Sequence, residues 1–285
     1  MISASSNMRV SEVLRQHWPE YLIEAWALGM FMISAGVFTT LLEYPGSPLR
    51  VAIMDADLRR ALNGVAMGIT AMALIYSPWG QRSGAHMNPA VTFTFWRLGK
   101  VKGSDAVFYV LAQFMGGTLG VLLTAALLHS AFTAPPVDYV VTLPGAQGVA
   151  WAFIAEVVIA ALMMWMVLNV SNSARYAKYT GMFAGLLVAT YIGIEAPLSG
   201  MSINPARSFA SAFPAHRWSH FWIYLLAPLL GMQAAAIVFV WRKYSTRCAK
   251  LLHPATQRCI HCGYTPERRA ALPKSHSEEV SGELL

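Results

Sequence analysis

Six long apolar segments, separated by short polar connections, constrain this chain more than any other feature. The segments cover residues 18–42, 61–76, 106–129, 149–170, 179–196 and 220–241. A helix needs about 20 residues to cross a bilayer, and only helices and closed barrels satisfy their backbone groups there. The chain of 285 residues is 56% apolar and only 12% charged, about half the charged share of soluble domains. The sequence therefore predicts an all-α membrane protein with six transmembrane helices.

The positive charges are distributed unevenly between the two sides of this predicted bundle. Sixteen of the 21 Lys and Arg residues lie in segments 1–17, 77–104, 171–178 and 242–285. Because basic loops stay on the cytoplasmic side, we expect both termini in the cytoplasm of a plasma membrane or a bacterial inner membrane. The net charge of +7 thus follows from membrane topology. Nucleic-acid binding is not expected, since it would need the basic residues on one folded face.

An internal repeat divides the chain into two halves. The segment SGAHMNPA at 83–90 and the segment SGMSINPA at 199–206 share five of eight residues, and Glu24 and Glu156 lie in matching apolar segments. Three spans in each half make the second half enter from the opposite side, which is an inverted repeat. The predicted parts are an N-terminal cytoplasmic tail (1–17), a first repeat (18–129), an extracellular loop (130–148), a second repeat (149–241) and a basic cytoplasmic tail (242–285).

Each repeated segment carries the signals of a helix start. Asparagine is among the best N-cap residues, and proline suits the first helical position because its missing N–H costs nothing there. Short helices are therefore predicted over 88–98 and 204–213, and both are too short to span a bilayer. Entering from opposite faces, they would bring their positive dipole ends together near the midplane.

These residues resemble a known family, the major intrinsic proteins, which comprise the aquaporins and glycerol facilitators. The resemblance covers residues 18–241 and rests on SGAHMNPAVT (83–92), NPARS (204–208) and the two glutamates. It implies an aquaporin-like fold of six spans plus two re-entrant half-helices, arranged as a homotetramer in the lipid bilayer. It also implies a passive channel, not an enzyme, with no cofactor in the pore. The implied pore midpoint consists of Asn88, Pro89, Ala90, Asn204, Pro205 and Ala206.

The resemblance also implies a selectivity filter at the outer constriction, with Arg207, Ile192 and Met201 as three of its walls. Counting back from Asn88 leaves Met67 and Gly68 as alternatives for the fourth wall. Because Gly68 forms a close-packing GxxxG pattern with Gly64, we favour Met67 in the pore. A charge in a membrane segment is functional by default, which singles out Arg207.

The filter departs from the water-specific pattern, because it lacks a histidine and an aromatic ring. The flanking residues are closest to nodulin-26-like members at four positions: Ser208, Ala212, Tyr224 and Leu225. We therefore expect passage of water and of small neutral, glycerol-like solutes, with exclusion of ions and protons. The alternative is a structural or junctional membrane protein of the same fold whose pore is closed or vestigial.

Three further residues are expected to support the re-entrant loops. Glu24 and Glu156 lie inside spans, where buried carboxylates need partners, and the family uses them to accept backbone N–H groups of these loops. A snorkelling position near the interface is the alternative for both. His86 is expected in the cytoplasmic vestibule as a structural histidine, with a pH gate as the alternative.

All three cysteines lie in the C-terminal tail, in the pattern Cys248-x4-His253-x5-Cys259-x2-Cys262. This set would suit tetrahedral zinc with Cys3His ligation, although the spacings are shorter than in the usual zinc fingers. A basic tail without fixed structure and a redox sensor are the alternatives. A disulfide is not expected in the cytoplasm.

Overall fold

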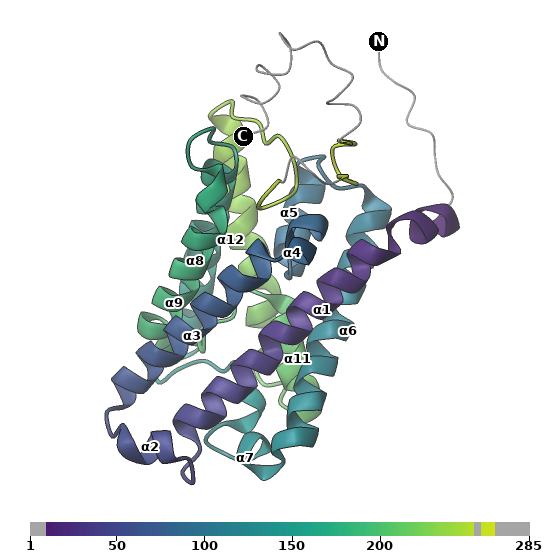
Figure 1. The fold of residues 1–285 in the computed structure, drawn as a ribbon. Helices are drawn as coiled ribbons and strands as arrows, with labels where there is room; N and C mark the ends of the chain where they lie inside the picture. The colour runs from purple at the N-terminus through teal and green to yellow at the C-terminus, as the bar shows by residue number, and fades with distance from the viewer. Residues whose placement is uncertain (1–9, 254–257, 266–285) are drawn as a thin grey trace, which may run out of the picture.

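The computed structural model describes residues 10–253 and 258–265, and its regular elements are helices throughout these ranges (Figure 1). Six of the described helices are long and apolar enough to cross a membrane. They are α1 (Val10–Glu43), α3 (Ala56–Tyr76), α6 (Gly103–Leu128), α8 (Val149–Ser171), α9 (Thr180–Ile194) and α12 (Phe221–Trp241). The fifth span reaches the required length only with the short helix before α9, and it covers Ala177–Ile194. The predicted all-α membrane fold is confirmed.

Two shorter helices lie inside the bundle, each at a predicted asparagine–proline pair. Helix α5 (Pro89–Arg97) has 9 residues and helix α11 (Pro205–Ala215) has 11 residues. At 1.5 Å per residue they extend about 14 and 17 Å, which is roughly half of a bilayer core of about 30 Å. A still shorter helix precedes each re-entrant loop, namely α4 (Pro78–Ser83) and α10 (Ala196–Ser199).

The two halves pack in the same way. Helix α1 lies along α6 in the first half, helix α8 lies along α12 in the second, and α3 and α9 join the halves. Glycines permit the close approach of these backbones, because a Cβ on Gly116 would collide with the carbonyl oxygen of Ala25 and one on Gly68 would meet that of Gly185. Small residues at helix contacts are the usual means of packing in a membrane.

The outer faces of the bundle are apolar and exposed. On α6, for example, Leu119 and Leu127 expose 63% and 67% of their surface, and Ile237 on α12 exposes 64%. Apolar surface continued over several helices needs an apolar partner. The lipid of a bilayer provides that partner, in agreement with the six spans.

The structure differs from the sequence prediction mainly at the start of the first span, where α1 begins at Val10 rather than at residue 18. The added turns are polar but are held by α6, since His17 Nδ1 lies 2.7 Å from Asp105 Oδ1 and the Tyr21 hydroxyl donates to the same oxygen at 2.6 Å. The connections also contain short helices that the sequence analysis did not predict: α2 (Pro48–Ala52), α7 (Ser130–Thr133), η1 (Asp138–Val140) and η2 (Ala177–Tyr179). Residues 1–9, 254–257 and 266–285 of the two predicted tails lie outside the described residues.

Candidate functional site

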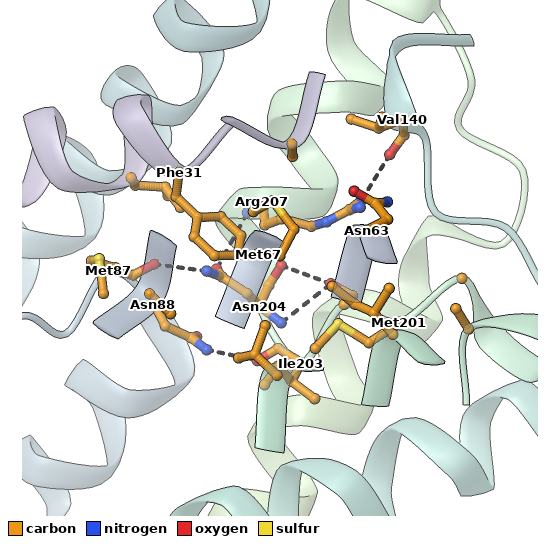
Figure 2. A pocket seen from close by; sticks show the side chains of 18 of the residues that line it. Phe31, Asn63, Met67, Met87, Asn88, Val140, Met201, Ile203, Asn204 and Arg207 are labelled. Atoms are coloured by element: carbon orange, nitrogen blue, oxygen red, sulfur yellow. Dashed lines mark hydrogen bonds between the residues drawn. The ribbon is translucent and has the colours of Figure 1, made fainter. Parts of the chain in front are cut away.

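The two half-helices begin at asparagines that lie next to each other at the centre of the bundle (Figure 2). Asn88 Oδ1 accepts from the N–H of Ala90 at 2.8 Å, and Asn204 Oδ1 accepts from the N–H of Ala206 at 3.1 Å. Both side chains therefore cap their helices, as the N-cap preference predicts. The positive ends of α5 and α11 consequently meet at this point.

The amide nitrogens of the two asparagines join the half-helices to each other. Asn88 Nδ2 donates to the carbonyl oxygen of Ile203 at 2.7 Å, and Asn204 Nδ2 donates to that of Met87 at 2.7 Å. The two bonds are equivalent under the repeat, because each acceptor directly precedes the other asparagine. Residues 115 positions or more apart in the chain are thus fixed within hydrogen-bonding distance at the midpoint.

The re-entrant loops before the asparagines have an unusual backbone that repeats between the halves. Ala85 and Met87 have φ values of 54° and 49°, and Met201 and Ile203 have values of 49° and 50°. A left-handed residue other than glycine is strained by about 1–3 kcal/mol, so neighbouring contacts must maintain these conformations. The repetition at an equal offset shows that the strain belongs to the shared motif.

Glu24 holds the first loop and is fully buried. Its Oε1 accepts from the N–H of His86 at 3.0 Å and from the Ser83 hydroxyl at 2.7 Å. Its Oε2 accepts from the N–H of Met87 at 2.6 Å and from Gln113 Nε2 at 2.8 Å. A buried carboxylate with four donors is a satisfied group, which excludes a snorkelling position for Glu24.

Glu156 does the same for the second loop and is also fully buried. Its Oε1 accepts from the N–H of Ser202 at 2.7 Å and from the Ser199 hydroxyl at 2.8 Å, and its Oε2 accepts from the N–H of Ile203 at 2.7 Å. The two glutamates therefore hold equivalent strained segments through charge-assisted hydrogen bonds, which are stronger than neutral ones.

Two tyrosines complete this support, and the sequence analysis did not assign them this role. The Tyr109 hydroxyl donates to the carbonyl of Ser83 at 2.8 Å, and the Tyr224 hydroxyl donates to that of Ser199 at 2.6 Å. They come from α6 and α12, which are equivalent helices of the two halves. Their matching places relative to the repeated segments were the signal that could have identified them.

A single cavity of about 500 Å³ runs beside the two asparagines. Its wall includes Ala56 at the first position of α3 and Ile75 near the last, so it follows about 29 Å of that helix at 1.5 Å per residue. The hydrocarbon core of a bilayer is about 30 Å thick. The cavity therefore extends over the full depth of the membrane-spanning bundle, and we call it the passage.

Four of the residues predicted for the filter line this passage: Met67, Ile192, Met201 and Arg207. The guanidinium of Arg207 is oriented by a 2.9 Å hydrogen bond from Nη1 to the carbonyl oxygen of Val140 (Figure 2). Gly68 faces α9 instead, where a Cβ would meet the backbone of Gly185. The prediction that offered Gly68 as a wall of the filter is therefore wrong, because Gly68 lies in the contact between α3 and α9.

The sequence analysis missed many of the lining residues, two of them close to Arg207. Phe31 of α1 and Asn63 of α3 both line the passage and lie near Arg207 in Figure 2. Asn63 Nδ2 donates to Thr39 Oγ1 at 3.1 Å, whereas its buried Oδ1 has no hydrogen-bond partner among the described residues. Both helices are apolar over most of their surface, so the sequence pattern did not reveal which side faces inward.

His86 lies at the end of the passage near α4 and uses both ring nitrogens. Nδ1 lies 3.0 Å from Thr92 Oγ1, and Nε2 lies 2.6 Å from the carbonyl oxygen of Ala249 in the C-terminal tail. The ring also stacks on Phe95 at a centroid distance of 5.2 Å. These contacts describe a structural histidine and connect the tail to the first re-entrant loop.

The four tail residues predicted as possible metal ligands come together as well. The ligand atoms of Cys248, His253, Cys259 and Cys262 all lie within 4.8 Å of one another. They belong to the described parts of the tail, residues 242–253 and 258–265, which fold back against the end of the bundle where α1 begins (Figure 1).

Together, the fold and the site define a class of membrane protein in which two inverted three-helix repeats surround a passage and two opposed half-helices meet at its midpoint. The chain belongs to the major intrinsic protein family, whose family model matches residues 11–239. The membership predicted from the two asparagine–proline–alanine segments is confirmed.

Individual relatives support this assignment. The chain is 33% identical over 177 residues to a probable aquaporin NIP-type of Nicotiana alata, a match that covers 61% of this chain and 63% of that protein. It is 34% identical over 183 residues to a probable aquaporin AqpM of Archaeoglobus fulgidus, covering 62% of this chain and 74% of that one. The match thus spans less than two thirds of the first relative. The NIP-type similarity agrees with the predicted closeness to nodulin-26-like members.

A solved structure shows the same fold. The X-ray structure of the aquaglyceroporin from Plasmodium falciparum superposes with a TM-score of 0.65 at 18% sequence identity. The similarity covers 78% of this chain and 95% of that one.

Proposed function

We propose that this protein is a passive channel for water and small uncharged solutes. One observation carries the proposal: a single cavity follows α3 from Ala56 to Ile75 and passes the two capping asparagines on its way. A passage of this length connects both faces of a bilayer. The proposal assigns no catalytic residue and no cofactor to the passage.

The midpoint supplies donors for a solute oxygen. A side-chain amide carries two N–H groups, and Asn88 and Asn204 each use one of them on a backbone carbonyl. One donor on each side chain remains for the passage. A water molecule that accepts from both turns its own hydrogens outward, which interrupts a proton wire. The positive ends of the half-helices oppose cations, and an ion cannot replace its hydration shell on the mostly apolar walls.

The constriction suits solutes that combine hydroxyl groups with a carbon skeleton. Met67, Ile192, Met201 and Phe31 offer apolar walls, while Arg207 and the side-chain amide of Asn63 offer polar groups. A hydroxyl both donates and accepts hydrogen bonds. We therefore propose water and glycerol-like polyols as permeants.

The membrane arrangement is part of the proposal. Basic residues are in excess on the side of the bundle that carries the first turns of α1 and the C-terminal tail. This excess supports cytoplasmic termini in a plasma membrane or a bacterial inner membrane. We further propose a homotetramer with one passage in each subunit, which is the arrangement that the family resemblance implies.

Light-scattering measurements on proteoliposomes test the proposal. Vesicles with the protein should shrink faster in hyperosmotic sucrose than empty vesicles, and should then swell in glycerol. Arg207→Ala should relax exclusion of larger or charged solutes without abolishing water flow. Shrinkage no faster than in empty vesicles, with folded protein present, would refute a permanently open channel and favour the structural alternative with a closed pore.

A further inference from the structure

The Cys248–Cys262 cluster has the dimensions of a tetrahedral metal site. Zn–S bonds of about 2.3 Å and Zn–N bonds of about 2.0 Å put sulfur pairs about 3.8 Å apart and nitrogen–sulfur pairs about 3.5 Å apart in a tetrahedral site. Cys248 Sγ lies 3.5 Å from Cys259 Sγ, and His253 Nε2 lies 3.2 Å from Cys262 Sγ. The four ligand atoms therefore surround a volume that fits one zinc ion.

The chemistry of the cluster also favours a cation. Zinc binds thiolates, and Cys248, Cys259 and Cys262 supply three sulfur ligands to the cluster. All three cysteines are free thiols, so none of their ligand capacity is used in a disulfide. Three thiolates, one neutral histidine and Zn²⁺ carry a net charge of −1.

Lys250 supplies the complementary charge. It is 98% buried, its Nζ has no hydrogen-bond partner among the described residues, and its charge acts on Cys259. A buried, unpaired ammonium is costly. A zinc–thiolate centre of charge −1 beside it would offset the positive charge of this ammonium.

The segment between the first two ligands is bound to the first re-entrant loop. The N–H of Leu251 donates to the carbonyl oxygen of Gly84 at 3.2 Å, and the carbonyl oxygen of Ala249 lies 2.6 Å from His86 Nε2. After the third ligand, His261 Nε2 lies 3.3 Å from the carbonyl oxygen of Ser83. The tail is thus fixed on both sides of the cluster.

Leu251 itself lines the passage. It is 94% buried and belongs to the same wall as Ile75, Ala85 and His86, at the end near the tail. The neighbouring Leu252 does not line the passage; both leucines border a second cavity between the tail and the connection from α8 to α9. An apolar side chain at a mouth narrows it and makes it drier, and hydrophobic constrictions of this kind gate channels.

We propose that Cys248, His253, Cys259 and Cys262 bind one zinc ion, and that this zinc site holds Leu251 in the tail-side mouth of the passage as a removable apolar plug. The gating part rests on the proposed channel function, whereas the metal site does not. With zinc bound, the backbone between Cys248 and His253 is fixed and Leu251 stays in the mouth. Without zinc, that constraint is lost, the plug leaves and permeability increases.

The metal site is tested first, on the purified full-length protein. Elemental analysis should find one zinc per chain, and Cys259→Ser/Cys262→Ser should remove it. Leu252→Ala is the control and should retain it. Protein without metal, whose thiols instead oxidise and reduce reversibly, would overturn the zinc site in favour of redox sensing. An absence of both metal and reversible oxidation would also overturn it.

The plug is tested by osmotic shrinkage of proteoliposomes. Water permeability per protein should rise severalfold after treatment with a zinc-selective chelator and return on addition of Zn²⁺ but not of Mg²⁺. Leu251→Ala should show the high permeability while still binding zinc, and Leu252→Ala should behave like wild type. Because Leu251→Ala and Leu252→Ala leave the cysteines unchanged, their comparison tests the plug even if the cysteine variants do not fold.

The outcomes separate the two proposals. Equal, fast water flow with and without zinc, or an unchanged Leu251→Ala variant, overturns the plug and leaves the channel function standing. No flow in either metal state and none in Leu251→Ala overturns the channel function itself. Flow that falls on removal of zinc contradicts the plug, because the tail would then support the open state.

Discussion

Replacing Glu156 tests how the second re-entrant loop is held in place. This carboxylate is fully buried and accepts three hydrogen bonds, from the Ser199 hydroxyl and from the N–H groups of Ser202 and Ile203. Ile203 and Met201 have left-handed backbones that these bonds maintain. Without the carboxylate, the loop loses the three hydrogen bonds that stabilise the conformation in which Asn204 is positioned.

The cost follows from the number of bonds. A buried donor left without a partner costs about 1–3 kcal/mol, so Glu156→Ala should lose about 3–9 kcal/mol from three donors. Glu156→Gln keeps one acceptor oxygen but turns an NH₂ group toward the N–H of Ile203 or of Ser202, so it should lose about 1–3 kcal/mol. Folded proteins are stable by only about 5–15 kcal/mol, so the alanine variant should be close to unfolding.

Thermal unfolding in detergent and water permeability in proteoliposomes measure the two consequences. Stability and permeability should both fall in the order wild type, Glu156→Gln, Glu156→Ala. Glu24→Ala should resemble Glu156→Ala because the loops are equivalent, and Glu12→Ala, an exposed position, serves as the control. A Glu156→Ala protein with wild-type melting temperature and permeability would refute the reasoning.

Three further predictions concern packing, selectivity and pH. Gly116→Ala should destabilise the protein in thermal unfolding by about 1–3 kcal/mol or more, because the new Cβ meets the carbonyl of Ala25, whereas Gly193→Ala, with open space around it, should change little. Asn63→Leu should slow glycerol uptake more than water flow, because it removes a polar side chain from the wall of the passage; equal effects on both would contradict that role. Burial raises the pKa of Glu195 from 4.5 to about 7. The folded state therefore keeps a proton that the unfolded chain releases, and stability should fall by about 3 kcal/mol as pH rises from about 4.5 to 7, a slope that Glu195→Gln should abolish in melting curves.

The sequence was most informative where one residue type has one structural use. Asparagine followed by proline predicts a helix start, and Asn88 and Asn204 cap α5 and α11 as expected. The repeat predicted that equivalent elements would recur, and the φ angles of Met87 and Ile203 agree to within one degree. An arginine in an apolar context pointed to Arg207, which lines the passage.

The sequence was least informative where contacts join distant segments. The polar first turns of α1 are helical because Asp105, far along the chain, binds His17 and Tyr21. Nothing local distinguishes the inward Asn63 from its neighbours, because both faces of a membrane helix can be apolar. Leu251 reaches the passage only through the folding of the whole tail, which no periodic pattern encodes.

The most direct test of the central claim places a large side chain either on the inward face or on the outward face of the same helix. Val188 and Leu186 both lie on α9, but Val188 lines the passage and Leu186 is 50% exposed on the outer face. Water permeability should be lost in Val188→Trp and kept in Leu186→Trp, with both variants folded and present in equal amounts. Unimpaired flow through Val188→Trp would contradict the claim that water crosses between the two asparagines.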